Sequence, residues 1–226
     1  MTAAAFFDLD GTLLRVNSGK LWFQRERAAG RLSRTAALEA GIWLSLYGLG
    51  LMRARTALGR AAATLAGSCE QEIDQRTRKF FEDDILSLFA PGGLAAVEAH
   101  KNAGDRVVLL TSSSLYLGRC VQEHLDLDDI LTMRFDVRDG LFTGGIETLC
   151  YGKAKITVAE EWADRQGIDL STSWFYSDSI TDFPMLDRVG HPRVVQPDPR
   201  LARRARKRGW PVLDWNSPPQ PEVRRA

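Results

Sequence analysis

The chain has 226 residues, of which 44% are hydrophobic and 26% are charged, and its formal net charge is +1. This composition excludes a disordered or fibrous protein and suffices for a sizeable core, either one domain with a large insert or two small domains. A nearly neutral chain has no overall field that would attract nucleic acid or a membrane. Three separated cysteines and an N-terminus that enters a strand within a few residues predict reduced thiols, no signal peptide and a cytoplasmic location.

The first predicted strand, residues 4 to 9, ends in two carboxylates. Asp8 and Asp10 stand two residues apart, and alternate residues of a strand share a face, so both side chains leave the sheet edge together. A turn at Gly11 and Thr12 would bring backbone amides close to whatever the carboxylates bind. The pattern indicates a site for an anion or a metal, although Asp and Gly also follow strands for conformational reasons alone.

Residues 19 to 89 interrupt the strand pattern with successive amphipathic helices. These helices are predicted at 21–29, 35–47, 52–65 and 70–89. Residues 41–52 form an uncharged apolar run that is shorter than the about 20 residues of a transmembrane helix. We interpret this run as the packed core of a helical cap, with a substrate-lining or membrane-facing surface as the alternatives.

From residue 91 onward, helices and strands alternate. Helices are predicted at 94–103, 115–124, 154–166, 182–187 and 198–208, strands at 106–111, 173–177, 193–196 and 211–215, and a hairpin at 133–148 with its turn at Asp139-Gly140. The alternation predicts an α/β fold with a doubly wound, mainly parallel, Rossmann-like sheet and a helical cap inserted after the first strand. Residues 1–16 and 90–216 would form the core, 17–89 the cap, and 217–226 a disordered tail.

Further polar residues lie at the ends of later strands, where ligands bind in this architecture. The strand 106–111 ends at Thr111, which Ser112 follows, and the strand 173–177 runs into Asp178. A second acid, Asp182, follows four residues later. Cations are available at the start of the helix 154–166, from Lys153 and Lys155. The arginines of the helix 198–208 are interpreted as the solvated face of a helix that packs through Leu201 and Ala205, not as a nucleic-acid site.

These residue types suit phosphoryl transfer. A phosphate monoester near Asp8 and Asp178 would be repelled, since each pair of like charges 4 Å apart costs about 4 kcal/mol at an effective dielectric constant near 20. A hard divalent cation on oxygen ligands removes this penalty, and Mg²⁺ is the usual choice. The reaction also needs an in-line nucleophile, donors for the phosphate oxygens and a proton for the leaving alkoxide, and a free carboxylate can be the nucleophile.

The ordered set Asp8-x-Asp10-x-Thr12, Thr111, a lysine and Asp178-x-x-x-Asp182 resembles the four motifs of the haloacid dehalogenase superfamily of phosphatases. The chain looks most like the phosphoserine-phosphatase-like subfamily, in which a helical cap lies between the first and second motifs. The resemblance covers about residues 3–215. It implies that Asp8 attacks phosphorus to give an aspartyl-phosphate. It also implies that Asp10 is the general acid and base and binds Mg²⁺ through its backbone carbonyl.

The resemblance also assigns roles to the other motif residues. Asp178 would ligate the metal, and Asp182 would support it directly or through water. Thr111 would hold a phosphate oxygen through its hydroxyl, helped by the amide of Ser112, and Thr12 is placed with these phosphate-binding residues.

Two assignments stay open at this stage. Lys155 directly precedes an aliphatic residue and is the preferred catalytic lysine, but Lys153 matches other members of the subfamily almost as well. Phosphoserine phosphatases carry a Glu for the substrate's amino group where this chain has Asn17, and a neutral amide cannot offer the same charge match. Asn17 is kept as a candidate substrate contact, and phosphoserine loses much of its claim as the substrate.

The leading hypothesis is a Mg²⁺-dependent phosphatase that hydrolyses a small phosphorylated metabolite resembling phosphoserine or histidinol phosphate, with no nucleic-acid partner. The alternatives are a phosphotransferase or mutase that uses the same aspartyl-phosphate, a lipid-phosphate phosphatase at a membrane surface, and a non-catalytic binding module. The last is disfavoured because the chain retains all four acids of the motifs. The sequence does not indicate an oligomeric state.

Overall fold

A computed structural model describes residues 3–31 and 54–216 and contains a seven-stranded sheet in the order β4-β3-β2-β1-β5-β6-β7. The strands are β1 (Ala4–Phe7), β2 (Arg106–Ser114), β3 (Asp129–Arg138), β4 (Leu141–Thr148), β5 (Trp174–Ser177), β6 (His191–Val195) and β7 (Val212–Leu213). Neighbouring strands are parallel except for β3 and β4, which are antiparallel. The predicted mainly parallel α/β fold is thereby confirmed.

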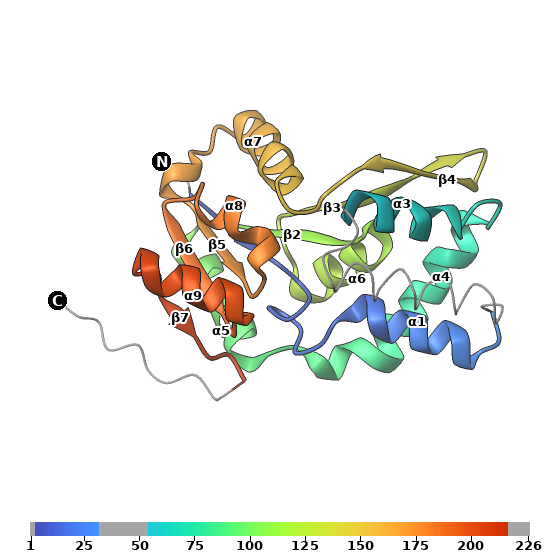
Figure 1. Cartoon of the computed structure of the whole chain (residues 1–226), viewed down its shortest axis with the longest axis horizontal. Coiled ribbons are helices and arrows are strands. Elements are labelled where there is room, and N and C mark those ends of the chain that lie inside the picture. The colour runs from blue at the N-terminus through green and yellow to red at the C-terminus, as the bar shows by residue number, and fades with distance from the viewer. Residues whose placement is uncertain (1–2, 32–53, 217–226) are drawn as a thin grey trace.

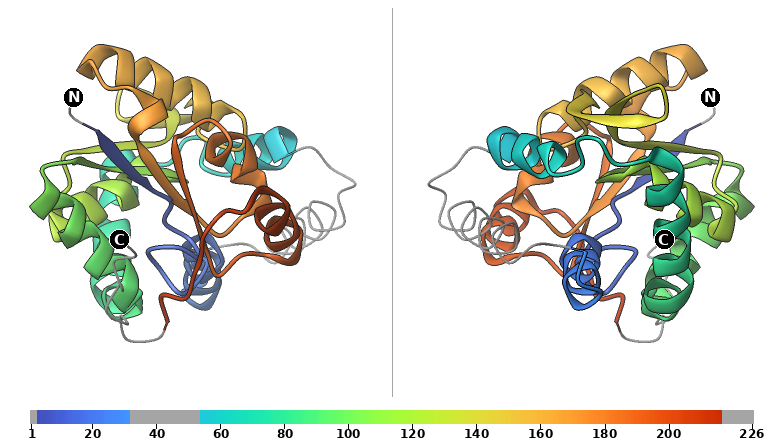
Figure 2. Two further views of the ribbon diagram at one scale, coloured as in Figure 1. Left: turned by 90° about the vertical axis from the view of Figure 1, so that its left-hand side faces the viewer. Right: turned by 90° about the vertical axis from the view of Figure 1, so that its right-hand side faces the viewer.

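Helices cover both faces of the sheet (Figures 1 and 2). The helices that follow the first 90 residues are α5 (Pro91–Ala103), α6 (Leu115–Leu125), α7 (Ala154–Gln166), α8 (Phe183–Leu186) and α9 (Pro199–Arg208). Phe7 belongs to a core shared with α5 and α6, and its neighbour Phe6 to a second core shared with α7, α8 and α9. Because successive strand residues face opposite sides, an all-apolar strand such as β1 predicts burial on both faces.

Between β1 and α5, the described residues form helices joined by loops and turns, and none of the seven strands lies there. The helices include α1 (Ser18–Ala28), α3 (Ala54–Ala63) and α4 (Glu70–Phe80). The prediction of one helix over 70–89 is wrong in its second half, where a π-helical turn (Phe81–Ile85) and a 3-10 turn (Leu86–Leu88) follow α4. The wider turn buries both Phe81 and Ile85. The helix predicted at 35–47, the apolar run 41–52 and the tail 217–226 lie outside the described residues, and the division into core and cap stays a prediction.

The predicted hairpin is present, with its turn at Asp139 and Gly140, both of which have positive φ angles (51° and 74°). The sequence prediction missed that β3 begins earlier, at Asp129, and pairs in parallel with β2 before it enters the hairpin. The last two predicted elements also differ. The strand at 211–215 is reduced to Val212–Leu213, and the helix at 182–187 is a 3-10 turn (Ile180–Asp182) followed by α8.

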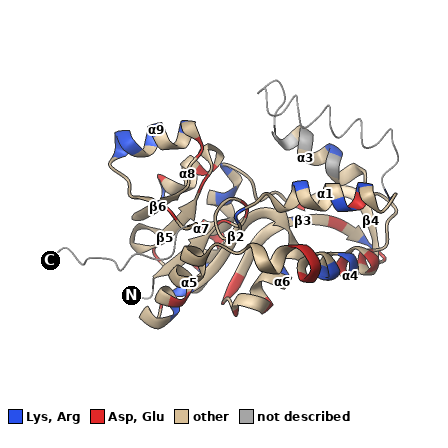
Figure 3. Ribbon diagram, turned by 90° about the horizontal axis from the view of Figure 1, so that it is seen from below, with Lys and Arg blue, Asp and Glu red and all other residues tan. Residues whose placement is uncertain are grey.

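The helix α9 buries Leu201 and Ala205, and its basic side chains are exposed, as expected for a solvated face. Figure 3 shows where its basic residues lie along the ribbon. Two of these arginines, Arg204 and Arg208, lie over the ring of Phe183. No helix within residues 3–31 and 54–216 is long and apolar enough to cross a membrane.

Candidate active site

Three neighbouring strands, β2, β1 and β5, bring the predicted polar residues to one edge of the sheet. Asp8 directly follows β1, and its backbone N–H donates to the carbonyl of Tyr176 in β5 (3.0 Å), so the ladder extends to the carboxylate. Thr111 lies in β2 on the other side of β1, and Asp178 follows β5. The parallel pairing therefore sets Asp8 between the other two positions, as the strand-tip argument predicts.

A lysine near the start of α7 reaches into this edge. The Lys155 ammonium donates to Asp8 Oδ1 (2.9 Å) and to Asp182 Oδ2 (2.7 Å), and the lysine is only 2% exposed. Asp182 Oδ2 also accepts from the hydroxyl of Ser177 at the end of β5 (2.8 Å). Lys153 lies two residues earlier, at the N-cap of α7, and is exposed. Of the two candidate lysines, only Lys155 contacts the predicted nucleophile.

Burial controls the protonation of the Asp8–Lys155 pair. Burial raises the pKa of Asp8 to about 7, although the adjacent Lys155 acts in the opposite direction. Burial disfavours the charge of Lys155, yet the carboxylates of Asp182 and Asp8 hold its pKa above the ordinary value. The lysine therefore stays cationic, and Asp8 is available as a carboxylate at and above neutral pH.

The side chain of Asp10 is held by residues that the sequence prediction missed. Its Oδ1 accepts from the backbone N–H of Ser18 at the start of α1 (2.8 Å), and its Oδ2 accepts from the Ser113 hydroxyl (3.4 Å). Burial raises the pKa of Asp10, and the hydrogen bonds from Ser18 and Ser113 oppose the rise. A carboxyl group that retains its proton more readily than usual suits a general acid.

Asp178 packs directly against the loop that carries Asp10. A Cβ atom at Gly11 would lie 2.3 Å from Asp178 Oδ2, and the φ angle of Gly11 is +72°, so both space and backbone conformation require glycine here. Burial, with repulsion from Asp8 and Asp182, raises the pKa of Asp178 to about 7. No residue of the described ranges donates a side-chain hydrogen bond to this carboxylate, so it lacks a cationic partner.

The donor set fits a hard cation such as Mg²⁺. Asp8 and Asp182 share Lys155, whereas the carboxylate oxygens of Asp178 have no partner of opposite charge among residues 3–31 and 54–216. Mg²⁺ usually binds one or two carboxylates and keeps several waters. Within the same residues, no group of three or more His, Cys, Asp or Glu side chains could hold a metal ion by itself. A metal site here would therefore combine two carboxylates, those of Asp8 and Asp178, with the backbone carbonyl of Asp10. The Asp182 carboxylate faces Lys155 instead, which disfavours its predicted metal role.

The phosphate-binding candidates separate into two groups. Thr111 is 1% exposed, and its hydroxyl accepts from the backbone N–H of Ser113 (3.1 Å), which holds the end of β2 in place beside Asp8. Ser112 follows it at the same strand end and is partly exposed. Thr12, by contrast, is fully buried, its hydroxyl has no partner among the described residues, and its N–H donates to the carbonyl of Leu9. This placement argues against the predicted phosphate contact of Thr12.

Asn17 has a structural function. Its side-chain oxygen accepts from the N–H of Lys20 (2.9 Å) and caps the N-terminus of α1. The cap fixes the start of the helix that presents the Ser18 N–H to Asp10. The predicted substrate contact is therefore disfavoured for the Asn17 oxygen, which is already engaged.

Comparison with known proteins identifies the family. Residues 5–187 match the haloacid dehalogenase-like hydrolase family. The chain belongs to this family. The hydrolase is 29% identical over 222 residues to the "Histidinol-phosphatase" of Neisseria meningitidis, covering 95% of this chain and 100% of that protein. It is 30% identical over 221 residues to the "Phosphoserine phosphatase SerB1" of Mycobacterium tuberculosis, covering 95% of this chain and 71% of the relative.

The solved structures agree with this result. A Bordetella pertussis Tohama I protein whose structure is described as having unknown function superimposes with a TM-score of 0.88 at 28% identity. The superposition covers 95% of this chain and all of that one. The fold therefore agrees with the family match, and the protein is an enzyme of the haloacid dehalogenase type, as its motifs predict.

The residues missed by sequence reasoning share one property. They are serines that donate hydrogen bonds to the predicted acids: Ser18 and Ser113 to Asp10, and Ser177 to Asp182. Each of these contacts joins a different pair of chain segments. Serines are common at strand ends and helix starts, so the sequence offered no signal beyond their closeness to the motifs.

Proposed function

We propose that this hydrolase is a Mg²⁺-dependent phosphomonoesterase that works through a covalent aspartyl-phosphate on Asp8. The observation that carries the proposal is the buried contact of the Lys155 ammonium with Asp8 Oδ1 (2.9 Å), beside the unpaired carboxylate of Asp178. The lysine keeps one carboxylate oxygen in a fixed position while the other is free to attack. The neighbouring acid is available for the cation that substrate binding requires.

In the first half of the reaction, an oxygen of Asp8 attacks phosphorus in line with the leaving alkoxide. The phosphorus–oxygen bond to the alcohol breaks, and Asp10 transfers its proton to that oxygen, so a neutral alcohol departs. The raised pKa of Asp10 supports this role because it favours the protonated form that the step requires. Its hydrogen bonds to Ser18 and Ser113 keep the carboxyl group oriented toward the leaving oxygen.

In the second half, water replaces the alcohol. Asp10, now a carboxylate, takes a proton from the water molecule, whose oxygen attacks phosphorus. The bond between phosphorus and the Asp8 oxygen breaks, and inorganic phosphate leaves. Using one carboxyl group as acid and then as base requires a pKa near the working pH, which burial of Asp10 favours.

Other side chains stabilise the charge that develops on the phosphoryl group. Lys155 provides a positive charge next to Asp8, and Asp182 holds the lysine in place with the help of Ser177. Thr111, in the neighbouring strand β2, would donate its hydroxyl to a phosphate oxygen. Preorganised donors of this kind in a buried site typically account for a large part of the rate enhancement.

Mg²⁺, when bound by Asp8, Asp178 and the Asp10 carbonyl, would neutralise negative charge between the carboxylates and the phosphate. Asp178 has no charged partner in the part of the chain that the structure describes, and burial together with repulsion from Asp8 raises its pKa. Both features support a cation site here.

The experiment is phosphate release from a panel of phosphomonoesters, with and without Mg²⁺, by the wild type and by Asp8→Asn. The names of the relatives make phosphoserine and histidinol phosphate the first compounds to include. We expect Mg²⁺-dependent release that the substitution abolishes. An Asp8→Asn protein with native turnover would exclude Asp8 as the nucleophile. Loss of the substrate without free phosphate would indicate transfer to a second hydroxyl group.

A further inference from the structure

The hairpin formed by β3 and β4 is irregular at two points. Arg134 pairs with Thr148 and Phe135 with Ile146, so Glu147 is an extra residue in β4. Between Phe135 and the next pair, Val137 with Phe142, β3 contributes one residue and β4 contributes three, residues 143–145. Extra residues of this kind bend a hairpin and re-aim side chains, and they are frequent next to active sites.

The bent hairpin is fastened to the helices that precede α5. The N–H of Gly67 donates to the carbonyl of Phe142 (2.8 Å), and the N–H of Phe142 donates to the carbonyl of Ser68 (3.0 Å). The N–H of Glu70 donates to the carbonyl of Gly140 (2.9 Å). At the second irregularity, a Cβ atom on Gly144 would lie 3.1 Å from the Cβ of Ala66. These contacts hold the first residue of α4, Glu70, against the hairpin.

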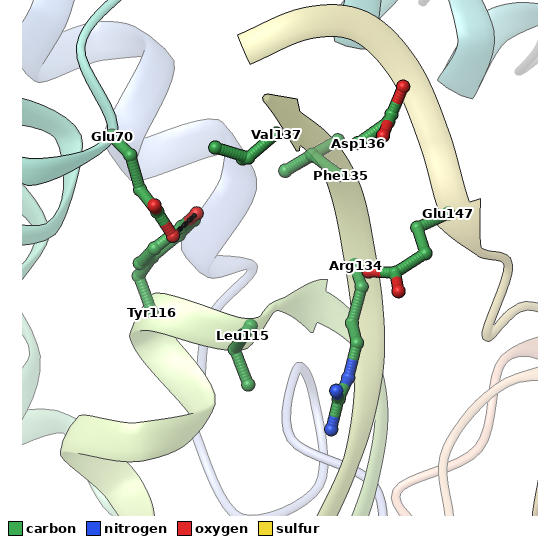
Figure 4. A pocket seen from close by; sticks show the side chains of 8 residues that line it. All are labelled: Glu70, Leu115, Tyr116, Arg134, Phe135, Asp136, Val137 and Glu147. Atoms are coloured by element: carbon green, nitrogen blue, oxygen red, sulfur yellow. Dashed lines mark hydrogen bonds between the residues drawn. The ribbon is translucent and has the colours of Figure 1, made fainter. Parts of the chain in front are cut away.

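The bend encloses a cavity of about 200 Å³ between the hairpin, the start of α6 and the start of α4 (Figure 4). The cavity lies near the proposed phosphate site. Its wall includes Leu115, only two residues after the Ser113 that contacts Asp10, and two residues of chain span about 7 Å at most. It also includes Arg134, next to the Met133 that pairs with Ser114 at the end of β2. This cavity is smaller than the about 300 to 1,000 Å³ of most ligand pockets and suits a small alcohol.

The charges around the cavity are unequal. Three carboxylates (Glu70, Asp136 and Glu147) and one guanidinium (Arg134) line it. Arg138 pairs with Asp136 (3.4 Å), which leaves a formal excess of one negative charge. Glu70 accepts from the Tyr116 hydroxyl (2.9 Å), and Asp136 accepts from the Thr143 hydroxyl (2.8 Å).

The side chains of Glu147 and Arg134 form no hydrogen bond or ion pair with any residue that the structure describes, and both are exposed and line the cavity. Figure 4 shows the Arg134 side chain extending away from Glu70 and Asp136, so its charge does not neutralise theirs. An unpaired carboxylate on the bulge of β4, in a cavity with excess negative charge, can therefore receive a cation. A protonated amine or an imidazolium is the kind of group that matches it.

We propose that this cavity receives the alcohol part of the substrate and that Glu147 selects alcohols that carry a protonated nitrogen. The inference rests on the proposed phosphatase function, because the phosphate must lie at Asp8 for the alcohol to reach the cavity. It assigns substrate discrimination to the hairpin, a part of the fold that contains none of the motif residues. The charge match that Asn17 cannot offer comes from a different part of the fold.

Two matched pairs of compounds test the proposal. Phosphoethanolamine and 2-hydroxyethyl phosphate differ only in an ammonium or hydroxyl group, and phosphoserine and 3-phosphoglycerate differ in the same way. We expect the wild type to have the higher kcat/KM for the amine in at least one pair. In Glu147→Gln this preference should fall about tenfold or more, as expected for loss of a hydrogen bond between charged groups. In Glu147→Lys it should reverse.

The matched control is Glu98→Gln, which removes a carboxylate that is 65% exposed on α5 and should leave the preference unchanged. p-Nitrophenyl phosphate, whose leaving group has no cation, separates the two proposals. If it is hydrolysed with dependence on Asp8 but the amines are not preferred, or if Glu147→Gln keeps the wild-type preference, the selection by Glu147 is wrong. If the folded wild type with Mg²⁺ hydrolyses neither p-nitrophenyl phosphate nor any compound of the pairs, the proposed function fails and this inference fails with it.

Discussion

Replacing Lys155 by Met tests the central contact of the candidate active site. The substitution keeps an unbranched side chain but removes the ammonium group that lies 2.9 Å from Asp8 Oδ1 and 2.7 Å from Asp182 Oδ2. Two buried carboxylates then face each other without a cation. Breaking a buried ion pair by removing one partner typically costs about 3 to 5 kcal/mol of the free energy of unfolding.

That cost can be converted into a shift of the melting temperature. Unfolding entropy is about 2.1 cal/mol/K per residue, so for a chain of 226 residues the Tm of Lys155→Met should fall by about 6 to 10 °C. The loss should be largest above neutral pH and should shrink toward pH 5, where the carboxylates can bind protons instead. Phosphatase turnover should fall about 100- to 1,000-fold, the usual effect of removing one preorganised charge-stabilising donor.

The assay is thermal unfolding at pH 5.0 and 8.0 together with phosphate release at saturating Mg²⁺. The matched control is Lys153→Met, because Lys153 is an exposed lysine only two residues away on the same helix start. The control should keep the wild-type Tm and turnover. A Lys155→Met protein with unchanged Tm and turnover, or a control that is the inactive variant, would refute the reasoning.

Three further predictions follow from the site. Gly11→Ala should raise the Mg²⁺ concentration needed for half-maximal activity at least several-fold, because the new Cβ atom would lie 2.3 Å from Asp178 Oδ2. Gly30→Ala is the control for backbone strain alone, because Gly30 has a similar φ angle of +69° and no neighbour within 4 Å of its Cβ position. Asp10→Asn should lower kcat about 100-fold or more. Phosphorylation of Asp8 should persist for substrates with good leaving groups and should be detectable as a burst of released alcohol. Equal losses for good and poor leaving groups would contradict the acid role. Without metal, stability should fall as the pH rises from about 4 to about 7, because Asp8 and Asp178, with pKa values raised to about 7, bind protons in the folded state that the unfolded chain has already lost. Mg²⁺ should therefore raise the Tm more at pH 8 than at pH 5, and equal shifts would show that these carboxylates do not hold it.

The sequence alone predicted the parts of the site that depend on local pattern and topology. The apolar residues before Asp8 predict a strand buried on both faces, and Phe6 and Phe7 indeed belong to cores on opposite faces. Alternating helices and strands predict a parallel sheet, and in such a sheet strand ends converge on one edge. The convergence of Asp8, Thr111 and Asp178 could therefore be predicted without coordinates.

Packing decided what local pattern left open. Lys153 and Lys155 begin the same helix, and no periodicity distinguishes the lysine that points toward the sheet from the lysine that points to solvent. Asp182 resembles a metal ligand in sequence, but its carboxylate accepts from Lys155 and Ser177, which only the fold brings together. Thr12 lies within the motif, yet its side chain turns into the protein.

The hairpin illustrates the same limit. Its turn at Asp139 and Gly140 follows from residue types that adopt positive φ angles. The extra residue at Glu147 depends on register between two strands, and register is set by what the hairpin packs against. Local propensities thus determined which elements form and at which strand ends the acids of the motifs lie. Contacts between distant segments decided which lysine meets Asp8, which acids have raised pKa values, and where the cavity beside the hairpin lies, because those properties arise only when separate segments are buried together.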